Sequence, residues 1–378
     1  MSKFIPLSVP NLKGNELAYV TKAVEDEWVS TGGTFIDQFE SSIAEYVHSA
    51  GAVACQSGTA GLHLALMAAG VDAGQEVIVP ALTFIAAVNP VKYIGADPVF
   101  MDCDDSLCMD MEKVEEFCQL QCSFSDGKLI DNLTDKQIKA ILIVHVFGNI
   151  ANIEKAFELA ERYNLVLVED ATEALGSYIK SGKFKEKFAG TIGYAGVYSF
   201  NGNKIMTTGG GGMIVSDNEE FLAKAKYLST QAKDDPLYYR HDHIGYNYRM
   251  TNLQAALGLA QLEQLEHFIT VKNDNYTYYQ EQGIKLLPFR KDIRTNAWFY
   301  SFMTEKRDDL IRYLSEHKIQ SRPVWDLICS LRPYEHCRSY KIEKACYYWE
   351  RIVNIPCSTN LEKEDIDLVV RAIKEFGQ

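Results

Sequence analysis

The chain has 378 residues, of which 47% are hydrophobic and 24% are charged, and its formal net charge is −13. This length favours two domains over one, and the negative charge argues against a general nucleic-acid-binding protein. No apolar run reaches the roughly 18 residues that cross a bilayer and the N-terminus lacks a signal-peptide core, so we expect a cytoplasmic protein without a membrane partner.

The first half of the chain alternates helical and strand-like segments. Apolar residues at helical spacing predict helices over residues 14–28, 35–47 and 152–163. Short apolar runs predict strands over residues 52–55, 76–80, 98–102, 141–146 and 165–168. Residues 123–137 are polar and are predicted to form a surface excursion. Apolar strands that alternate with helices indicate a parallel or mixed sheet in an α/β fold.

The first strand is followed by a small-residue turn, Gln56-Ser-Gly-Thr-Ala-Gly61, and then by an apolar helix. A strand, a tight turn and a helix start present backbone N–H groups and a positive helix end to an anion such as a phosphate. The alternative is a simple helix cap, with Ser57 or Thr59 accepting the free amides.

Polar residues follow the strands of the predicted sheet, where ligands of such sheets bind. Asp170 and Glu173 follow one strand, His145 and Asn149 follow another, and Thr83 and Phe84 follow a third. Each has a structural alternative: Asp170 as a helix cap, His145 as a core histidine, Phe84 as core packing. Their coincidence at one sheet edge favours a site.

Lys204 lies between two apolar runs, the first ending at Ser199 and the second beginning after the glycines at positions 209–212. A lysine in such a setting either forms a Schiff base with an aldehyde cofactor or is an ordinary surface lysine at a hairpin. The neighbouring anion turn and acid favour the first interpretation.

The second half begins with a predicted helix over residues 218–229 and a Tyr-, His- and Arg-rich segment over 234–249. Thr251 is expected to cap a long helix that ends at Gln282 and Gly283. We expect this helix to link a large domain, residues 1–260, to a smaller one, residues 261–378, which the N-terminal segment contacts. Further predicted elements are a strand over 298–303 and helices over 308–317 and 363–376.

Metal binding is not expected. His241 and His243 have the spacing of two ligands, but a third ligand of suitable spacing is missing. The nine cysteines are scattered without a Cys-x-x-Cys pair, which predicts reduced, mainly structural thiols.

Several motifs in this order resemble the DegT-type sugar-nucleotide aminotransferases of the fold-type I pyridoxal-phosphate (PLP) superfamily. The motifs are Ile5-Pro-Leu-Ser-Val-Pro-Asn11, Ser57-Gly-Thr59, Pro80-Ala-Leu-Thr-Phe84, Glu169-Asp-Ala-Thr-Glu-Ala-Leu-Gly176, Ser199-Phe-Asn-Gly-Asn-Lys204 and Gly245-Tyr-Asn-Tyr-Arg-Met250. The resemblance implies a large α/β domain with a mixed central sheet and a smaller C-terminal α+β domain.

The resemblance also implies roles for individual residues. Lys204 matches the Schiff-base lysine, and Asp170 matches the carboxylate that keeps the pyridine nitrogen of PLP protonated. Phe84 matches the aromatic residue that stacks on the ring, and Glu173, where many relatives have glutamine, is expected near the phenolic oxygen. Phosphate contacts match Ser57, Gly58, Thr59, Ala60 and Ser199, and Asn247 of a neighbouring subunit, which implies a homodimer. Substrate contacts are expected from Trp28, Ser30, Thr31, Arg249, Arg322 and Trp325.

The activity implied is transfer of an amino group from L-glutamate to a nucleotide-linked keto sugar, with pyridoxamine phosphate as the intermediate and Lys204 as the general base. The segments around Trp28, Phe100, His145 and Lys204 resemble the legionaminic acid subgroup. That subgroup aminates C4 of a UDP-linked 2-acetamido-4-keto-6-deoxy hexose, in surface-glycan synthesis of the legionaminic acid or bacillosamine type. GDP- or dTDP-linked 3- or 4-keto sugars remain alternatives. A pyridoxamine-dependent dehydratase of the same family carries histidine at the lysine position, so Lys204 argues against that activity. A non-catalytic binding protein would not need Lys204 and Asp170 together, so the presence of both argues against such a protein.

Overall fold

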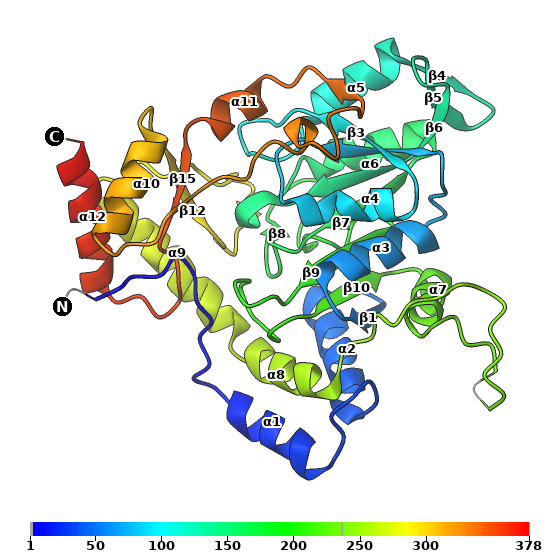
Figure 1. Cartoon of the computed structure of the whole chain (residues 1–378), viewed down its shortest axis with the longest axis horizontal. Helices are drawn as coiled ribbons and strands as arrows, with labels where there is room; N and C mark the ends of the chain where they lie inside the picture. Colours follow the sequence, from blue (N-terminus) through cyan, green and yellow to red (C-terminus); the bar gives the residue numbers. More distant parts are fainter. Residues whose placement is uncertain (1–2, 236, 378) are drawn as a thin grey trace.

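The computed structural model describes residues 3–235 and 237–377, and its centre is a mixed β-sheet (Figure 1). In spatial order its strands are β1 (Gly51–Cys55), β10 (Gly212–Ser216), β9 (Ala195–Ser199), β7 (Val166–Asp170), β6 (Lys136–Val144), β2 (Glu76–Pro80), β3 (Asp97–Met101) and β14 (Ser339–Tyr340). The strands from β9 to β14 in this order run parallel, whereas β10 is antiparallel to both neighbours. The predicted α/β fold with a mixed sheet is confirmed.

Residues 123–137 are largely exposed at the surface, as their polarity suggested, but they form regular structure. They contain most of a hairpin of β4 (Cys122–Ser125) and β5 (Lys128–Asp131), which extends the main sheet because β5 pairs with the first half of β6. Asp126 and Gly127 both have positive φ, at 51° and 70°. Such a turn matches the twist of the two strands, and an Asp-Gly pair favours it.

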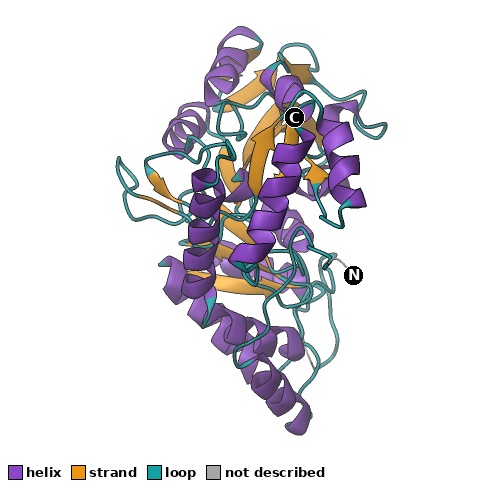
Figure 2. Cartoon of the chain, turned by 90° about the vertical axis from the view of Figure 1, so that its left-hand side faces the viewer, coloured by secondary structure: helices purple, strands orange, loops and turns teal. Residues whose placement is uncertain are grey.

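Helices lie on both sides of the strands (Figure 2). They are α1 (Glu16–Glu25), α2 (Thr34–Val47), α3 (Gly58–Ala68), α4 (Asn89–Tyr93), α5 (Met111–Leu120), α6 (Ile153–Tyr163), α7 (Glu219–Ser229), α8 (Asn252–Leu262), α9 (Leu265–Glu281), α10 (Arg307–Glu316), α11 (Lys344–Trp349) and α12 (Lys363–Phe376). Polar side chains cap several of their first turns: Ser57 for α3, Asp110 for α5, Asn152 for α6 and Thr251 for α8. These residues accept the amides that a helix leaves unpaired, which fixes where each helix begins.

The single long helix predicted from Thr251 to Gln282 is in fact two helices, α8 and α9. Glu263 and Gln264 separate them, and both residue types favour helices, so the sequence carries no visible break there. Asn15 and Tyr19 both donate hydrogen bonds to the Glu263 carboxylate. The break therefore coincides with a contact made by the N-terminal part of the chain.

The C-terminal part forms a separate group of strands and helices beside α9, away from the main sheet (Figure 1). Its strands β12 (Tyr300–Met303), β15 (Ile352–Ile355) and β13 (Arg322–Pro323) form one sheet, and α10 and α12 lie beside it. The N-terminal segment joins this part, because Ile5 pairs with Ile319 and the Cys357 N–H donates to the Leu7 carbonyl. The domain boundary at residue 260 stays a prediction.

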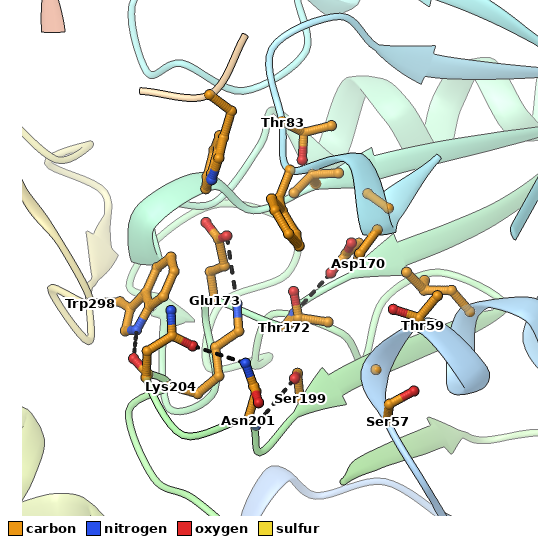
Figure 3. A pocket seen from close by; sticks show the side chains of 18 of the residues that line it. Ser57, Thr59, Thr83, Asp170, Thr172, Glu173, Ser199, Asn201, Lys204 and Trp298 are labelled. Atoms are coloured by element: carbon orange, nitrogen blue, oxygen red, sulfur yellow. Dashed lines mark hydrogen bonds and ion pairs between the residues drawn. The ribbon is translucent and has the colours of Figure 1, made fainter. Parts of the chain in front are cut away.

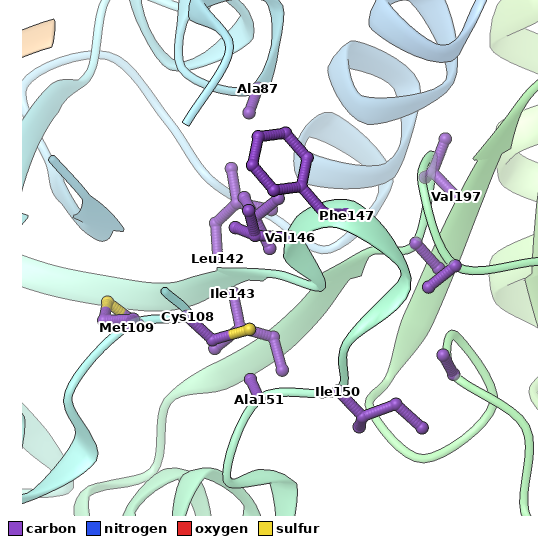
Figure 4. Packing of buried hydrophobic residues seen from close by; sticks show 14 of the residues in the cluster. Ala87, Cys108, Met109, Leu142, Ile143, Val146, Phe147, Ile150, Ala151 and Val197 are labelled. Carbon is purple, nitrogen blue, oxygen red and sulfur yellow. The ribbon is translucent and has the colours of Figure 1, made fainter. Parts of the chain in front are cut away.

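Two further short strands, β8 (Tyr178–Ile179) and β11 (Ile293–Arg294), pair across the two halves of the chain. The 3-10 turn η2 (Val146–Gly148) follows β6, and Figure 4 shows Phe147 among buried apolar residues of the core. Because η2 begins there, β6 ends at Val144 rather than at residue 146 as predicted. Within the part of the chain that the structure describes, no helix combines the length and apolar character needed to cross a bilayer.

A buried carboxylate attaches the C-terminal part to the edge of the main sheet. Asp102, which is 0% exposed, accepts hydrogen bonds from the backbone N–H groups of residues 343, 344 and 345 and from Lys113 Nζ. Burial alone would raise the pKa of Asp102, but these donors outweigh it and hold the pKa below its usual value. The neighbouring strand β14 pairs with β3 at the same edge.

We expect Asp102→Asn to lower the free energy of unfolding by about 2–4 kcal/mol, because it removes a buried charge whose four donors then lack their full partner. Urea denaturation measures the loss. Asp105→Asn is the matched control. Asp105 forms an ion pair with Lys344 at the start of α11, where Asp102 also binds, but the Asp105 side chain is 77% exposed. It should cost less than about 1 kcal/mol. Equal losses for the two variants would contradict the anchoring role of Asp102.

Candidate active site

A cavity of about 240 Å³ opens where the parallel strands end (Figure 3). It is lined by Thr83 after β2, Val144 at the end of β6, Asp170 at the end of β7 and Ser199 at the end of β9. The start of α3, the segment around Lys204, and residues 298, 299 and 325 complete the wall. This cavity lies at the carboxyl edge of the sheet, where the sequence predicts the site.

The first turn of α3 faces this cavity through Ser57, Gly58 and Thr59. Ser57 Oγ accepts the Ala60 N–H at 3.1 Å, so Ser57 caps α3, whereas anion binding at this turn stays a prediction. Close packing brings this turn against the sheet: a Cβ on Gly58 would lie 2.9 Å from Ser199 Cβ, and a Cβ on Gly212 would lie 2.6 Å from the Ser57 backbone. Glycine at both positions therefore lets the helix start lie beside β9 and β10.

Glu169 and Asp170 are adjacent on β7 and have different partners, because successive residues of a strand point to opposite faces of the sheet. Glu169 is 0% exposed and accepts the N–H groups of residues 190, 192 and 193, and its Oε2 lies 2.8 Å from His145 Nε2. Burial alone would raise the pKa of Glu169, but His145 and the backbone donors hold it below its usual value. His145 is thus a buried partner of Glu169 and not a wall of the cavity.

Asp170 lines the cavity and is 3% exposed. One of its oxygens accepts the Thr172 N–H at 3.0 Å, and the described residues supply no ion-pair partner within contact distance. Burial raises the pKa of this carboxyl group. A cation or a protonated ring nitrogen placed beside Asp170 would relieve that penalty.

Lys204 extends into the cavity between an aromatic ring and a carboxylate. Its Nζ lies 4.1 Å from the centre of the Trp298 ring and 3.6 Å from Glu173 Oε1 (Figure 3). Trp298 Nε1 donates to the Asn203 carbonyl at 2.7 Å, which fixes the backbone just before the lysine. The alternative of an exposed hairpin lysine is therefore wrong, because the Lys204 side chain is only 12% exposed.

Glu173 contacts both Lys204 and the η2 turn. Its Oε2 accepts the Phe147 N–H at 2.8 Å, and Phe147 has a φ of 57°, a strained value for a residue with a side chain. The carboxylate thus holds η2 in place beside the cavity. Burial raises the pKa of Glu173 to about 7, although the charge of Lys204 acts in the opposite direction.

Aromatic side chains surround the mouth of the cavity. Phe84 is 50% exposed, and its ring centre lies 6.3 Å from that of Trp325, which in turn lies 4.9 Å from Phe147. Phe84 and Trp325 both line the cavity. An exposed aromatic ring at a cavity mouth is free to stack on a flat ligand.

Other predicted site residues lie outside the cavity wall: Ala60, Asn247, Trp28, Ser30, Thr31, Arg249 and Arg322. Thr31 and Arg249 instead line a separate cavity of about 230 Å³, where the Nε atom of Arg249 is buried without a partner. His241 and His243 contact a backbone carbonyl and a tyrosine, and no three metal-ligand side chains converge anywhere in residues 3–235 and 237–377.

Sequence reasoning missed Trp298 as part of the site. It lies almost a hundred residues after Lys204 in the chain, and no motif or periodicity relates the two. Thr172 and Asn203 were also missed, although each stands inside a motif that the sequence analysis had singled out.

The residues present fit PLP. An unpaired buried carboxylate suits its pyridine nitrogen, a lysine amine in the same cavity suits its aldehyde, and a helix start with hydroxyl side chains suits its phosphate.

Comparison with known proteins identifies the family of the chain. Residues 10–374 match the model of the DegT/DnrJ/EryC1/StrS aminotransferase family. A curated relative, the GDP-perosamine synthase of Escherichia coli O157:H7, is 37% identical over 99% of this chain and 99% of its own length. A DegT DnrJ EryC1 StrS aminotransferase from Brucella abortus shares the fold with a TM-score of 0.87 and 26% identity, over 96% of this chain and 95% of that one. So does Spr1654 of Streptococcus pneumoniae in its PLP form, with a TM-score of 0.87 and 23% identity, over 99% and 98% of the two chains. The expected closeness to the legionaminic acid subgroup is not among these similarities.

Glu173 predicts a pH-dependent stability. Its pKa is about 7 in the folded chain against an ordinary value of 4.5, so the folded state binds the extra proton between these values and stability falls as the pH rises through them. In the chain without added cofactor, we expect Glu173→Gln to remove this fall. The stability of the variant relative to the wild type should therefore increase between pH 5 and pH 7, by up to about 1.4 kcal/mol per pH unit. Urea denaturation at several pH values measures it. The exposed Glu158→Gln is the control and should give a flat difference, and a flat difference for Glu173→Gln as well would refute the raised pKa.

Proposed function

The chain belongs to the DegT/DnrJ/EryC1/StrS aminotransferase family, and from this membership we propose that it aminates C4 of a GDP-linked 4-keto-6-deoxy sugar with L-glutamate as the donor. It is a PLP-dependent aminotransferase. The observation that carries the proposal is the amine of Lys204, held in the same cavity as the unpaired carboxylate of Asp170.

When bound, PLP supplies an aldehyde carbon that takes up the amino group and a ring that accepts electrons from the reacting carbon. Lys204 holds the cofactor between turnovers. When free, its Nζ would act as the general base that takes the proton from the α-carbon of glutamate, and it would move a proton in the reverse direction when the keto sugar has replaced the donor. One lysine thus acts in both half-reactions, so we expect ping-pong kinetics.

The other cavity residues bind and orient. Asp170 keeps the pyridine nitrogen protonated, since that proton neutralises its buried charge. Ser57, Gly58, Thr59 and Ser199, together with the positive end of α3, would hold the phosphate. Ala60 was also expected to contribute, but it lies outside the cavity wall and its N–H is already accepted by Ser57 Oγ. Phe84 would cover the ring face, and Glu173 would lie near the phenolic oxygen. Trp325, which lines the cavity, would contact the sugar nucleotide.

The relative from Escherichia coli O157:H7 supports a GDP-linked substrate over the UDP-linked 2-acetamido sugar that the sequence analysis expected. Its name describes a synthase of a GDP-linked product, and the similarity extends over nearly the whole of both chains. Synthesis of a surface glycan is the process that such a product would serve. The remaining expected contacts, from Trp28, Ser30, Thr31, Arg249 and Arg322, stay predictions.

A homodimer with shared sites is the second part of the proposal. Tyr246 and Tyr248 stack on each other at 5.0 Å and contact His63, so Asn247 between them is exposed on the opposite side of the extended segment. The neighbouring loop exposes large apolar side chains, Leu237, Tyr238, Tyr239 and Ile244, each more than two-thirds exposed. Such a surface favours burial against a second copy, where Asn247 would reach the phosphate of the partner's cofactor.

Lys204→Ala should be colourless and inactive with L-glutamate and GDP-linked 4-keto-6-deoxy sugar. Lys180→Ala, an exposed lysine, should behave as the wild type. We expect the wild type to prefer the GDP- over the UDP-linked sugar by at least about 10-fold in kcat/KM, and NMR of the product should place nitrogen on C4. Full activity in Lys204→Ala would contradict the mechanism. A preference for the UDP-linked sugar would contradict the substrate assignment alone.

Shared sites predict complementation between two inactive variants. Lys204→Ala lacks the amine, and Asn247→Asp places a carboxylate against the partner's phosphate. When equal amounts are unfolded and refolded together, half of the dimers are mixed, and each mixed dimer has one intact site, so activity should return to about a quarter of the wild-type value. No recovery would mean that Lys204 and Asn247 serve the same site from one chain.

A further inference from the structure

A second lysine, Lys272 on α9, is buried in the core next to the site. It is 3% exposed, and its Nζ donates to the carbonyl of Trp298 at 2.7 Å and to that of Cys357 at 2.6 Å. Among the described residues no carboxylate forms an ion pair with it, and burial lowers its pKa. Buried charges are ordinarily paired with an opposite charge, so an ammonium whose hydrogen bonds go to two backbone carbonyls is unusual.

The Lys272 ammonium joins three segments that are far apart in sequence. These are α9, the stretch leading into β12 through Trp298, and the stretch that follows β15 through Cys357. The Tyr300 ring centre lies 5.3 Å from Nζ, and the Tyr300 hydroxyl donates to the Lys272 carbonyl at 2.7 Å. The position of the Trp298 backbone therefore depends on this ammonium.

Trp298 transmits this position to Lys204. It is 2% exposed, and Phe299 stacks on its ring at 4.0 Å with the two planes 10° apart. The indole contacts the cofactor lysine segment at two points: Lys204 Nζ lies 4.1 Å from the ring centre, and Nε1 donates to the Asn203 carbonyl. Lys204 and Lys272 also line one small cavity together with Gln261.

We propose that Lys272 is a positioning residue for the cofactor lysine: by clamping the Trp298 carbonyl, it fixes the ring on which the Lys204 amine rests. The proposal relies on the role assigned to Lys204 above. Lys272 does not line the active-site cavity. Its effect is on the approach of the Lys204 amine to the aldehyde carbon, where a displacement of about 1 Å can slow a reaction by about 100-fold.

The test is the rate at which full-length chain, stripped of cofactor, captures added PLP. Lys204 joins its nitrogen to the aldehyde carbon with loss of water, and borohydride then supplies a hydride that makes the bond permanent for mass spectrometry. We expect Lys272→Met to slow capture by about 10- to 100-fold and Lys272→Arg, which keeps charge and donors, to stay within about threefold of the wild type. Tyr279→Phe is the matched control, since it removes a buried hydrogen bond from α9 to the Pro356 carbonyl without touching Trp298, and it should capture PLP at the wild-type rate.

A double variant separates positioning from a general loss of stability. If Lys272 acts through Trp298, then Lys272→Met should slow capture no further in a Trp298→Leu background, whereas independent effects would multiply. Multiplied effects, or wild-type capture by Lys272→Met, would overturn the proposal. If Lys272→Met does not fold, Trp298→Phe replaces it in the test. This variant keeps a ring but loses the hydrogen bond to the Asn203 carbonyl. Slower PLP capture would support the proposal, and capture at the wild-type rate would contradict it. Labelling of a lysine other than Lys204 in the wild type would instead refute the proposed function.

Discussion

The buried carboxylate of Glu169 is the constraint on which the site depends. Three backbone N–H groups and His145 satisfy it: the N–H groups belong to the segment that leads into β9, and His145 directly follows β6. With Glu169 fixed in this way on one face of β7, Asp170 next to it lines the cavity on the other. Asp170 is therefore positioned by a neighbouring carboxylate that already has its partners. Asp170 itself accepts the Thr172 N–H and has no ion-pair partner among the described residues.

Much of the site follows from local sequence. The turn at Ser57 and the strand that ends in Glu169 and Asp170 are short-range patterns, and so is Lys204 between two apolar runs; the structure brings all of them to one cavity. Three contacts could not be predicted: Trp298 under Lys204, Glu173 on the η2 turn, and Lys272 on the Trp298 carbonyl. Each depends on how distant segments pack. The break between α8 and α9 was missed for the same reason, because α1 makes the contact there and both break residues favour a helix.

The cavity belongs to neither half of the chain alone. Its floor comes from the strands of the main sheet, while Trp298, Phe299 and Trp325 come from the C-terminal part. The segment beyond Trp325 is attached to the main sheet, since the Ile328 N–H donates to the Ala81 carbonyl and β14 pairs with β3. The aromatic side chains of the cavity are thus attached to the same sheet that carries Asp170, so their position relative to Asp170 is fixed.

The attachment of β14 and Asp102 also bears on how the chain is made. During synthesis the edge of β3 stays open, and the Asp102 carboxylate lacks its backbone donors, until residues 339–345 have left the ribosome. Contacts between segments so far apart in sequence form late and slowly. The nascent chain therefore carries an exposed sheet edge for most of its synthesis, which is the interval in which it is most open to wrong strand pairing and to chaperones.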